Sequence, residues 1–237
     1  MARAYAPVYD HDDERVHIPM DAFTYEGFQR WMESDEFPES GRIDFLAGKV
    51  EVDLSPEDLY THGAVKFAVG LTLGDLLVRT GLADIQTDRA RLRSRLAGLS
   101  AEPDLIVLFK ETLTSGRAKL VPASHRKSPD RYIAVEGAAD VVVEIISDSS
   151  KKKDTESLPP LFARAGIPER WIVDARGASL RFEIWALRNG AYELQPTDAG
   201  GWVISPRLGC AFRLIRFTDP PIPWRYVLEH RELNELT

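Results

Sequence analysis

The fold is decided by one stretch of sequence, Val141-Val142-Val143-Glu144-Ile145-Ile146. All of its residues except Glu144 are apolar and β-branched, which is typical of a strand that is covered on both faces. A second stretch, Pro103-Asp104-Leu105-Ile106-Val107-Leu108, has an aspartate at the start of another apolar strand. A charge in such a place is costly to bury unless it is paired or binds a metal ion. The sequence therefore predicts an α/β protein with two buried strands that each present one carboxylate.

Asp104 and Glu144 together predict a metal site. Two carboxylates at the ends of neighbouring strands repel each other, and a hard cation relieves that repulsion. Mg²⁺ (or Mn²⁺) prefers oxygen ligands and keeps several of its waters, so two or three carboxylates are sufficient. Asp44, on an earlier hairpin strand, is a third candidate ligand, although an exposed turn acid would occupy the same place. The alternative for Asp104 and Glu144 is solvation at a strand end or an ion pair with arginine.

Length and composition place the chain among ordinary globular proteins. Its 237 residues suit one large domain, and 44% of them are hydrophobic and 28% charged. Cys210 is the only cysteine, which excludes a disulfide within the chain and favours a small buried residue at that position. The N-terminus has no apolar run of signal-peptide length, and no segment approaches the ~18 apolar residues of a membrane span. We therefore expect a cytoplasmic protein without a membrane segment.

The other periodic segments predict a central mixed sheet flanked by helices. Residues 42–52 alternate around a glycine-containing turn, which indicates a β-hairpin. Ser55 suits the N-cap of a long helix that should run to about Arg79. A shorter helix should cover about residues 158–165, with Gly166 at its C-terminal end.

Three segments are expected to lie outside the sheet and helices that form the core. Residues 1–19 form an irregular arm, and the polar segment 110–137 forms a long surface excursion. Residues 218–237 form a tail that begins with a proline-rich turn and ends in an acidic helix. The domain itself would then span residues 20–217.

His62 lies near the start of the helix predicted after Ser55. Steps of three and four residues place it on the same face as Val65 and Val69. A single histidine on an apolar stripe is usually a half-buried core residue. It becomes a candidate site residue if the N-terminus of this helix points toward the acids.

Basic residues that are candidates for nucleic-acid contact occur in two places. Four arginines alternate in the segment 89–95, so in a strand they would project from one face. That stripe suits a phosphate backbone, which arginine binds through two N–H groups, and equally suits an edge strand protected by charge. Three lysines follow the Glu144 strand; such a run is usually solvated, yet it is the nearest cation in sequence to Glu144. With a net charge of −7, any nucleic-acid role depends on local patches. The residues are Arg89, Arg91, Arg93, Arg95, Lys151, Lys152 and Lys153.

In their order along the chain these residues resemble the Uma2 family (also called DUF820), a branch of the PD-(D/E)XK nuclease superfamily. The similarity covers about residues 20–217. Its most specific part is the segment 161–174, where a helix, a glycine stop and a tryptophan-containing strand follow the Glu144 strand. The other segments that carry it are the 44–50 hairpin, Ser55-Pro56 with His62, Pro103-Asp104 and Val143-Glu144-Ile145-Ile146-Ser147.

The resemblance implies a restriction-endonuclease-like core, a mixed sheet with flanking helices. It also implies that Asp104 and Glu144 hold a divalent metal ion, whose bound water attacks phosphorus while the metal and a lysine stabilise the developing charge. The family position that matches Asp44 is usually glutamate, and aspartate is one methylene shorter. His62 matches a helix histidine of the family, which makes it a candidate catalytic residue.

The lysine of the family has no counterpart at its usual position. It commonly lies on the helix after the Glu strand, one turn before an aromatic residue, and counting back four from Phe162 gives Leu158. Pro159 and Pro160 follow at once and fit only the first turn of a helix. Loss of one transition-state donor typically lowers a rate by roughly 10²–10³. Either Lys153 or a neighbour enters the site, or the protein is a weakened or inactive relative.

The sequence thus supports a leading function and an alternative. The leading hypothesis is a Mg²⁺-dependent endonuclease that hydrolyses phosphodiester bonds in DNA. By analogy with the superfamily, a homodimer would supply the two sites that cutting both strands needs. The alternative is a non-catalytic module that uses a nuclease fold to bind nucleic acid or protein. A glycosidase is disfavoured because nothing places an aromatic sugar groove near both acids. The candidate catalytic residues are Asp104, Glu144, Lys153, His62 and Asp44.

Overall fold

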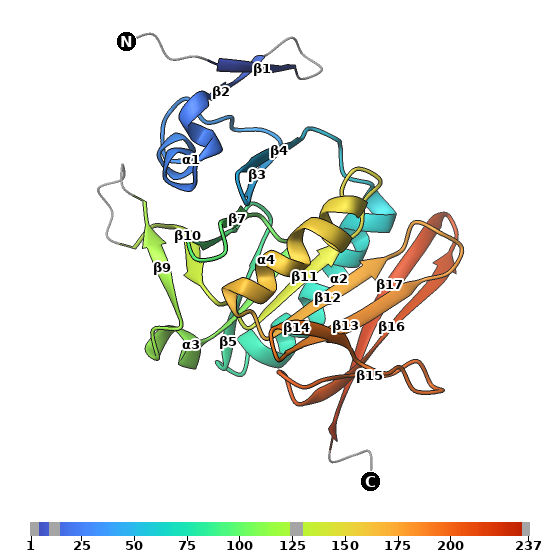
Figure 1. Cartoon of the computed structure of the whole chain (residues 1–237). Coiled ribbons are helices and arrows are strands. Elements are labelled where there is room, and N and C mark those ends of the chain that lie inside the picture. The colour runs from blue at the N-terminus through green and yellow to red at the C-terminus, as the bar shows by residue number, and fades with distance from the viewer. Residues whose placement is uncertain (1–4, 10–14, 124–129, 234–237) are drawn as a thin grey trace.

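The computed structural model describes residues 5–9, 15–123 and 130–233 (Figure 1). Two six-stranded sheets, one three-stranded sheet and one two-stranded hairpin are formed within these ranges, together with helices that pack against them. The predicted mixed α/β architecture is therefore confirmed. No helix in the described ranges is both long enough and apolar enough to cross a lipid bilayer.

The central sheet has the strand order β14-β13-β12-β11-β8-β5. β11 (Val141–Ile145) lies between β12, with which it is parallel, and β8, with which it is antiparallel. Every residue of β11 is buried, as its apolar sequence predicted. The other strands of this sheet are β5 (Ala83–Thr87), β8 (Leu105–Phe109), β12 (Glu169–Asp174), β13 (Arg181–Arg188) and β14 (Ala191–Leu194).

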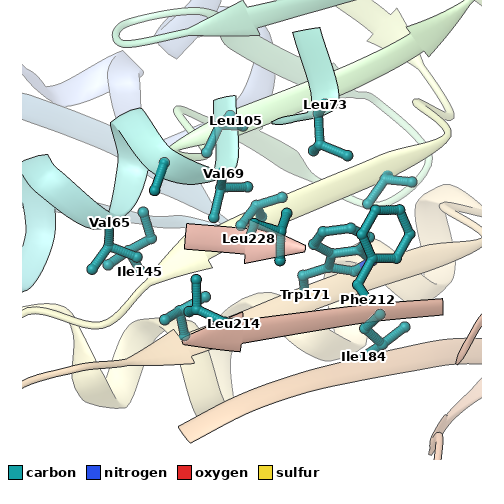
Figure 2. Close-up of a cluster of buried hydrophobic side chains, with 14 of the residues drawn as sticks. Val65, Val69, Leu73, Leu105, Ile145, Trp171, Ile184, Phe212, Leu214 and Leu228 are labelled. Atoms are coloured by element: carbon teal, nitrogen blue, oxygen red, sulfur yellow. The ribbon is translucent and has the colours of Figure 1, made fainter. Parts of the chain in front are cut away.

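One face of the central sheet is covered by α2 (Ala64–Leu73) and by a three-stranded sheet of β15, β16 and β17. Figure 2 shows Val65, Val69 and Leu73 of α2 in the same apolar cluster as Trp171 and Phe212. These side chains are almost completely buried and form the larger core of the protein. The bounds of the three strands are β15 (Val203–Ser205), β16 (Cys210–Asp219) and β17 (Ile222–Glu232).

The opposite face of the central sheet meets α4 (Leu158–Ala165) and the second six-stranded sheet. That sheet has the order β4-β3-β7-β6-β10-β9. α4 ends as predicted at Gly166, whose φ of 77° is the left-handed conformation that glycine adopts most easily. The strands of the second sheet are β3 (Arg42–Leu46), β4 (Lys49–Asp53), β6 (Arg91–Ser94), β7 (Leu99–Ala101), β9 (Ala118–Pro122) and β10 (Tyr132–Gly137).

The segment 110–137 is more regular than its polar composition predicted. It contains α3 (Lys110–Thr114) and the strands β9 and β10, which pair with each other and with β6. Only residues 124–129 within it lie outside the described ranges. The prediction failed because the edge strand β9 has one buried residue, Ala118, and the adjacent strand β10 has two, Ala134 and Val135, so neither shows a clear apolar period.

The long helix predicted from Ser55 to Arg79 begins later. Asp58 is its N-cap, because its side chain accepts hydrogen bonds from the backbone N–H groups of Tyr60 and Thr61. Ser55 therefore lies before the helix. The helical segment consists of the π-helical turn η2 (Leu59–Gly63), α2, and a second π-helical turn, η3 (Gly74–Val78).

Both chain ends are more extended than predicted. The arm contains the antiparallel pair β1 (Tyr5–Tyr9) and β2 (Arg15–Pro19), followed by η1 (Met20–Phe23) and α1 (Tyr25–Met32). In the described part of the tail a strand replaces the predicted helix, because β17 pairs with β16; residues 234–237 lie outside the described ranges. Alternation explains this outcome, because Tyr226 and Leu228 are buried while Val227 between them is 44% exposed.

Candidate active site

Asp104 and Glu144 lie side by side on the face of the central sheet that meets α4. In the antiparallel pairing of β8 with β11, Leu105 is opposite Val143, so the next positions along the two strands are Asp104 and Glu144. Glu144 has the same side-chain direction as Val142, which belongs to the α4 cluster. Both acids are only 1% exposed. The backbone N–H of Ile145 donates to Asp104 Oδ2 at 2.7 Å, which fixes that carboxylate.

Glu144 is buried without the hydrogen bonds that a buried carboxylate normally has. Neither Oε1 nor Oε2 has a partner among the residues that the structure describes. Burial raises the pKa of Glu144 well above its usual value, and the neighbouring carboxylates Asp154 and Asp104 raise it further. Because buried polar atoms in folded proteins are almost always satisfied, these oxygens are the clearest indication of a cation-binding site.

Asp154 is a fourth acid of the site, and the sequence did not predict it. It is 1% exposed, and its Oδ2 accepts a hydrogen bond from Ser150 Oγ at 2.5 Å. Its Oδ1 has no partner within the described ranges. Burial raises the pKa of Asp154 to about 6. Asp154 directly follows Lys153, so its place in the site depends on where the helix containing both residues begins.

Lys153 enters the site from a helical turn that the sequence did not predict. The chain is helical from Lys151 onward, and the π-helical turn η4 (Lys153–Ser157) precedes α4. The N–H of Leu158 donates to the carbonyl of Lys153, five residues earlier. Pro159, which lacks an N–H, is accommodated just after this wider turn. Leu158, where the family's lysine was expected, is instead 1% exposed in the apolar cluster under α4.

Asp44 joins the second sheet to this helix. Its Oδ1 accepts a hydrogen bond from the N–H of Glu102 at 3.0 Å, and its Oδ2 accepts one from Lys153 Nζ at 2.8 Å. Although burial alone would lower the pKa of Lys153, the charge of Asp44 and the other acids raises it, so the ammonium stays protonated. Both oxygens of Asp44 are thus engaged, and in this arrangement Asp44 holds Lys153.

Three basic side chains lie around Asp104. Arg42 Nη2 donates to Asp104 Oδ1 at 2.8 Å, His62 Nε2 lies 3.3 Å from Oδ2, and Lys66 Nζ lies 3.7 Å from Oδ1. Burial alone would raise the pKa of Asp104, but the hydrogen bond from His62 and the charge of Arg42 hold it well below its usual value. The pKa of His62 is raised in turn, because Asp104 outweighs the opposing effect of burial. Asp104 is therefore ionised and well paired, in contrast to Glu144.

His62 lies beside the acids, the condition under which the sequence makes it a candidate site residue. It lies in η2 at the start of the long helical segment, is 3% exposed and faces Asp104. Glu57 Oε2 lies 3.5 Å from its Nδ1, and ligand atoms of Glu57, His62 and Asp104 lie within 4.8 Å of one another. The sequence missed Arg42 and Lys66, yet each leaves a signal, since Arg42 precedes Asp44 by two residues and Lys66 follows His62 by four.

Two cavities reach this group of charges. One, of about 430 Å³, is lined by Asp44, Lys153 and Ser150 among others. The other, of about 180 Å³, is lined by His62, Glu57 and Glu102 among others. Both are also bounded by the segment that joins β4 to η2 and by the loop after β11, and they share Arg42, Asp53, Ser55, Pro56 and Ser149.

The predicted arginine stripe is not formed as one exposed face. The strand β6 covers only Arg91–Ser94, and Arg91 and Arg93 are 2% and 9% exposed. Arg91 pairs with Glu102 and its guanidinium lies 5.5 Å from the Phe28 ring centre, while Arg93 Nη1 lies 3.1 Å from Glu33. Their face is covered by α1, so these two side chains stabilise the fold. The exposed members of the predicted nucleic-acid set are Arg89, Arg95, Lys151 and Lys152.

Comparisons with known proteins identify the family of this chain. The model of the Uma2 family, described as "Putative restriction endonuclease", matches residues 25–215. This chain belongs to the Uma2 family. A solved structure with the same fold is a crystal structure of a "putative nuclease belonging to DUF820" from Anabaena variabilis, with a TM-score of 0.57 and 15% identity over 78% of this chain and 90% of that one. No curated protein matches the sequence.

Proposed function

We propose that this Uma2 protein is a divalent-metal-dependent nuclease that hydrolyses phosphodiester bonds in DNA. The observation that carries the proposal is Glu144, whose two buried oxygens have no partner among the described residues and lie beside ionised Asp104. The family description and the nuclease title of the Anabaena structure support the same reaction class. The donors are carboxylate oxygens, the ligands that Mg²⁺ and Mn²⁺ prefer, so the residues present fit such an ion.

Asp104 and Glu144 are the proposed ligands of that ion. When bound, a divalent cation supplies an activated water and neutralises charge on the phosphate. The protein's own groups perform the rest: Asp44 holds Lys153, whose ammonium is directed at the acids and is positioned to stabilise negative charge on a substrate. His62 keeps Asp104 ionised through its Nε2 contact. DNA as the substrate agrees with exposed Lys151 and Lys152 directly before Lys153.

The test is cleavage of supercoiled plasmid DNA with Mg²⁺ or Mn²⁺, compared with EDTA. Asp104→Asn and Glu144→Gln should each lower the cleavage rate by roughly 10²-fold or more, the usual effect of removing an essential transition-state interaction. Asp75→Asn, a surface acid that pairs with Arg79 on the far part of the same helical segment, is the matched control and should cleave at the wild-type rate.

Wild-type activity that persists in Asp104→Asn would refute the proposal. DNA binding without cleavage under every metal, unchanged by Glu144→Gln, would instead support the non-catalytic binding module. These two results are separable, because binding is measured by anisotropy of a labelled oligonucleotide in the absence of turnover.

A further inference from the structure

Arg42 is a charged residue of the site for which the Uma2 resemblance gave no role. It is the first residue of β3, two residues before Asp44, so both side chains project from the same face of the strand. This face points at the central sheet, where Arg42 Nη2 donates to Asp104 Oδ1. Arg42 therefore belongs to the second sheet and places a permanent positive charge beside the acids of the central sheet.

Among the basic side chains that contact the site acids, Arg42 is the most accessible. Its side chain is 20% exposed, whereas those of His62, Lys66 and Lys153 are 4%, 8% and 8% exposed. Arg42 also lines both cavities, while Lys153 lines only the larger of the two and His62 only the smaller. A solute in either cavity can therefore reach the side chain of Arg42.

The surroundings of Arg42 in the cavities suit an anion. Ser55 and Ser149 line both cavities with it and supply hydroxyl groups. Asp53, the acid that also lines both, is already engaged: its Oδ2 accepts from Ser149 Oγ at 2.7 Å and its Oδ1 accepts from the N–H of Ser55 at 2.9 Å. Its charge is thereby partly offset. Most other acids of the two cavities are also paired: Asp44 with Lys153, Glu57 and Asp88 with Lys66, and Glu102 with Arg91.

We propose that Arg42 is the phosphate-binding residue of this site, whose guanidinium exchanges Asp104 for the non-bridging oxygens of the scissile phosphate. The inference rests on the proposed nuclease function and names its substrate-binding cation. A guanidinium has five N–H donors in a planar fork that matches phosphate oxygens, and the described contacts use one of them, on Asp104. Lys153 is less suited, because its ammonium is held by Asp44.

The exchange has a thermodynamic consequence at Asp104. Arg42 and a divalent cation both interact with this carboxylate, so each weakens the other's hold on it. A phosphate that draws Arg42 away from Asp104 therefore strengthens cation binding, and bound cation strengthens phosphate binding by the same factor. Through Arg42, metal ion and substrate would each increase the affinity of the site for the other. A counter-ion that merely fixes the Asp104 rotamer would have the opposite effect, because its removal would disorder a ligand and weaken metal binding.

The test compares Arg42→Ala and Arg42→Lys with wild type and with Arg188→Ala, a surface arginine of β13 far from the acids. Mn²⁺ alone, titrated by calorimetry, should bind Arg42→Ala roughly fivefold or more tightly than wild type, the lower end of typical coupling between sites. Arg42→Lys keeps the charge and should bind Mn²⁺ as wild type does. Arg188→Ala should leave every readout unchanged.

The substrate arm uses a short fluorescein-labelled DNA oligonucleotide with EDTA present. Arg42→Ala should weaken its binding by roughly 10-fold or more, as expected for the loss of a charged hydrogen bond, and Arg42→Lys should also weaken it because the fork is lost. Added guanidinium ion should restore cleavage to Arg42→Ala in proportion to its concentration, which a structural role would not allow.

Weaker Mn²⁺ binding by Arg42→Ala, or unchanged oligonucleotide binding by both variants, would overturn the assignment. If Arg42→Ala does not fold, Arg42→Lys alone decides, since normal Mn²⁺ affinity with weakened DNA binding is the proposed pattern. If wild type cleaves nothing, the proposed function fails, yet the Mn²⁺ and oligonucleotide measurements still test Arg42.

Discussion

Two groups of buried carboxylates lie at opposite ends of β11 and differ in their partners. At its start, Asp140 is 0% exposed, and its oxygens accept hydrogen bonds from Phe109 N–H at 2.8 Å, Thr112 Oγ1 at 2.9 Å and Arg207 Nε at 2.8 Å. The neighbouring Glu169 is also 0% exposed and accepts from Trp171 Nε1, Ser205 Oγ and the N–H of Arg207.

At the other end, Glu144 and Asp154 are each 1% exposed, yet three of their four carboxylate oxygens have no partner in the described part of the chain. Burial is therefore the same in both groups and only hydrogen bonding distinguishes them. A satisfied acid such as Asp140 holds elements together, whereas an unsatisfied acid such as Glu144 is retained at a cost in stability that a ligand can offset. Four predictions test this difference.

The largest effect should come from breaking the satisfied group. Asp140→Ala leaves the guanidinium of Arg207 beside an apolar side chain and removes the acceptor for Phe109 N–H and Thr112. We expect the free energy of unfolding, from urea denaturation, to fall by about 3–5 kcal/mol, as for other broken buried pairs. Asp75→Ala, which removes an exposed acid paired with Arg79, should change it by less than about 1 kcal/mol. Equal losses in the two variants would contradict the distinction.

A cation should stabilise the unsatisfied group and not the other. Mn²⁺ at 100 times its dissociation constant should raise the free energy of unfolding of wild type by about 2.7 kcal/mol, because it binds only the folded state. Glu144→Gln, which removes the charge of the least satisfied ligand, should gain much less at the same concentration. Thermal denaturation with and without Mn²⁺ measures both. A gain in Glu144→Gln as large as in wild type would place the cation elsewhere.

The pH dependence of stability should report Asp154. Burial raises its pKa from the usual 3.8 to about 6. A raised pKa in the folded state means that the group's contribution to stability is complete below about pH 4 and is lost as the pH rises through about 6.

Asp154→Asn lacks this titration and can still accept from Ser150. With EDTA present, its free energy of unfolding should equal that of wild type near pH 4. At pH 7.5 it should exceed that of wild type by about 1–3 kcal/mol, since one pKa unit corresponds to about 1.4 kcal/mol and the group is coupled to Glu144. Urea denaturation at several pH values provides the test, and a difference independent of pH would show that Asp154 does not titrate in this range.

Local sequence signals predicted the parts of the site that depend on one strand or one helix end. The apolar runs around Asp104 and Glu144 predicted their strands, and Gly166 predicted the end of α4. Lys153 was predicted only from its nearness to Glu144, because Pro159 suggested that the helix begins after it. The π-helical turn η4 allows the helix to begin earlier and brings Lys153 to Asp44.

Contacts between the two sheets were not predictable in this way. Arg42 meets Asp104 across 62 residues of sequence, and nothing local in either strand specifies that meeting. The alternating arginines correctly indicated a strand at β6, but they did not indicate which face of that strand would be exposed to solvent. α1 covers the face that bears Arg91 and Arg93, so these arginines contact acids and aromatic rings and not solvent. Periodicity identifies the faces of a strand, and only packing decides which face is buried.

The smallest effect should come from neutralising a satisfied acid without removing its shape. Glu169→Gln keeps a carbonyl oxygen to accept from Trp171 Nε1 at 2.7 Å and from Ser205 Oγ at 2.5 Å, but turns its NH₂ group toward the N–H of Arg207. One hydrogen bond is lost, so the free energy of unfolding should fall by about 1 kcal/mol. The Mn²⁺-dependent gain in stability should equal that of wild type, since Glu169 is not a proposed ligand. A loss as large as that of Asp140→Ala would mean that charge, and not hydrogen bonding, makes the satisfied group structural.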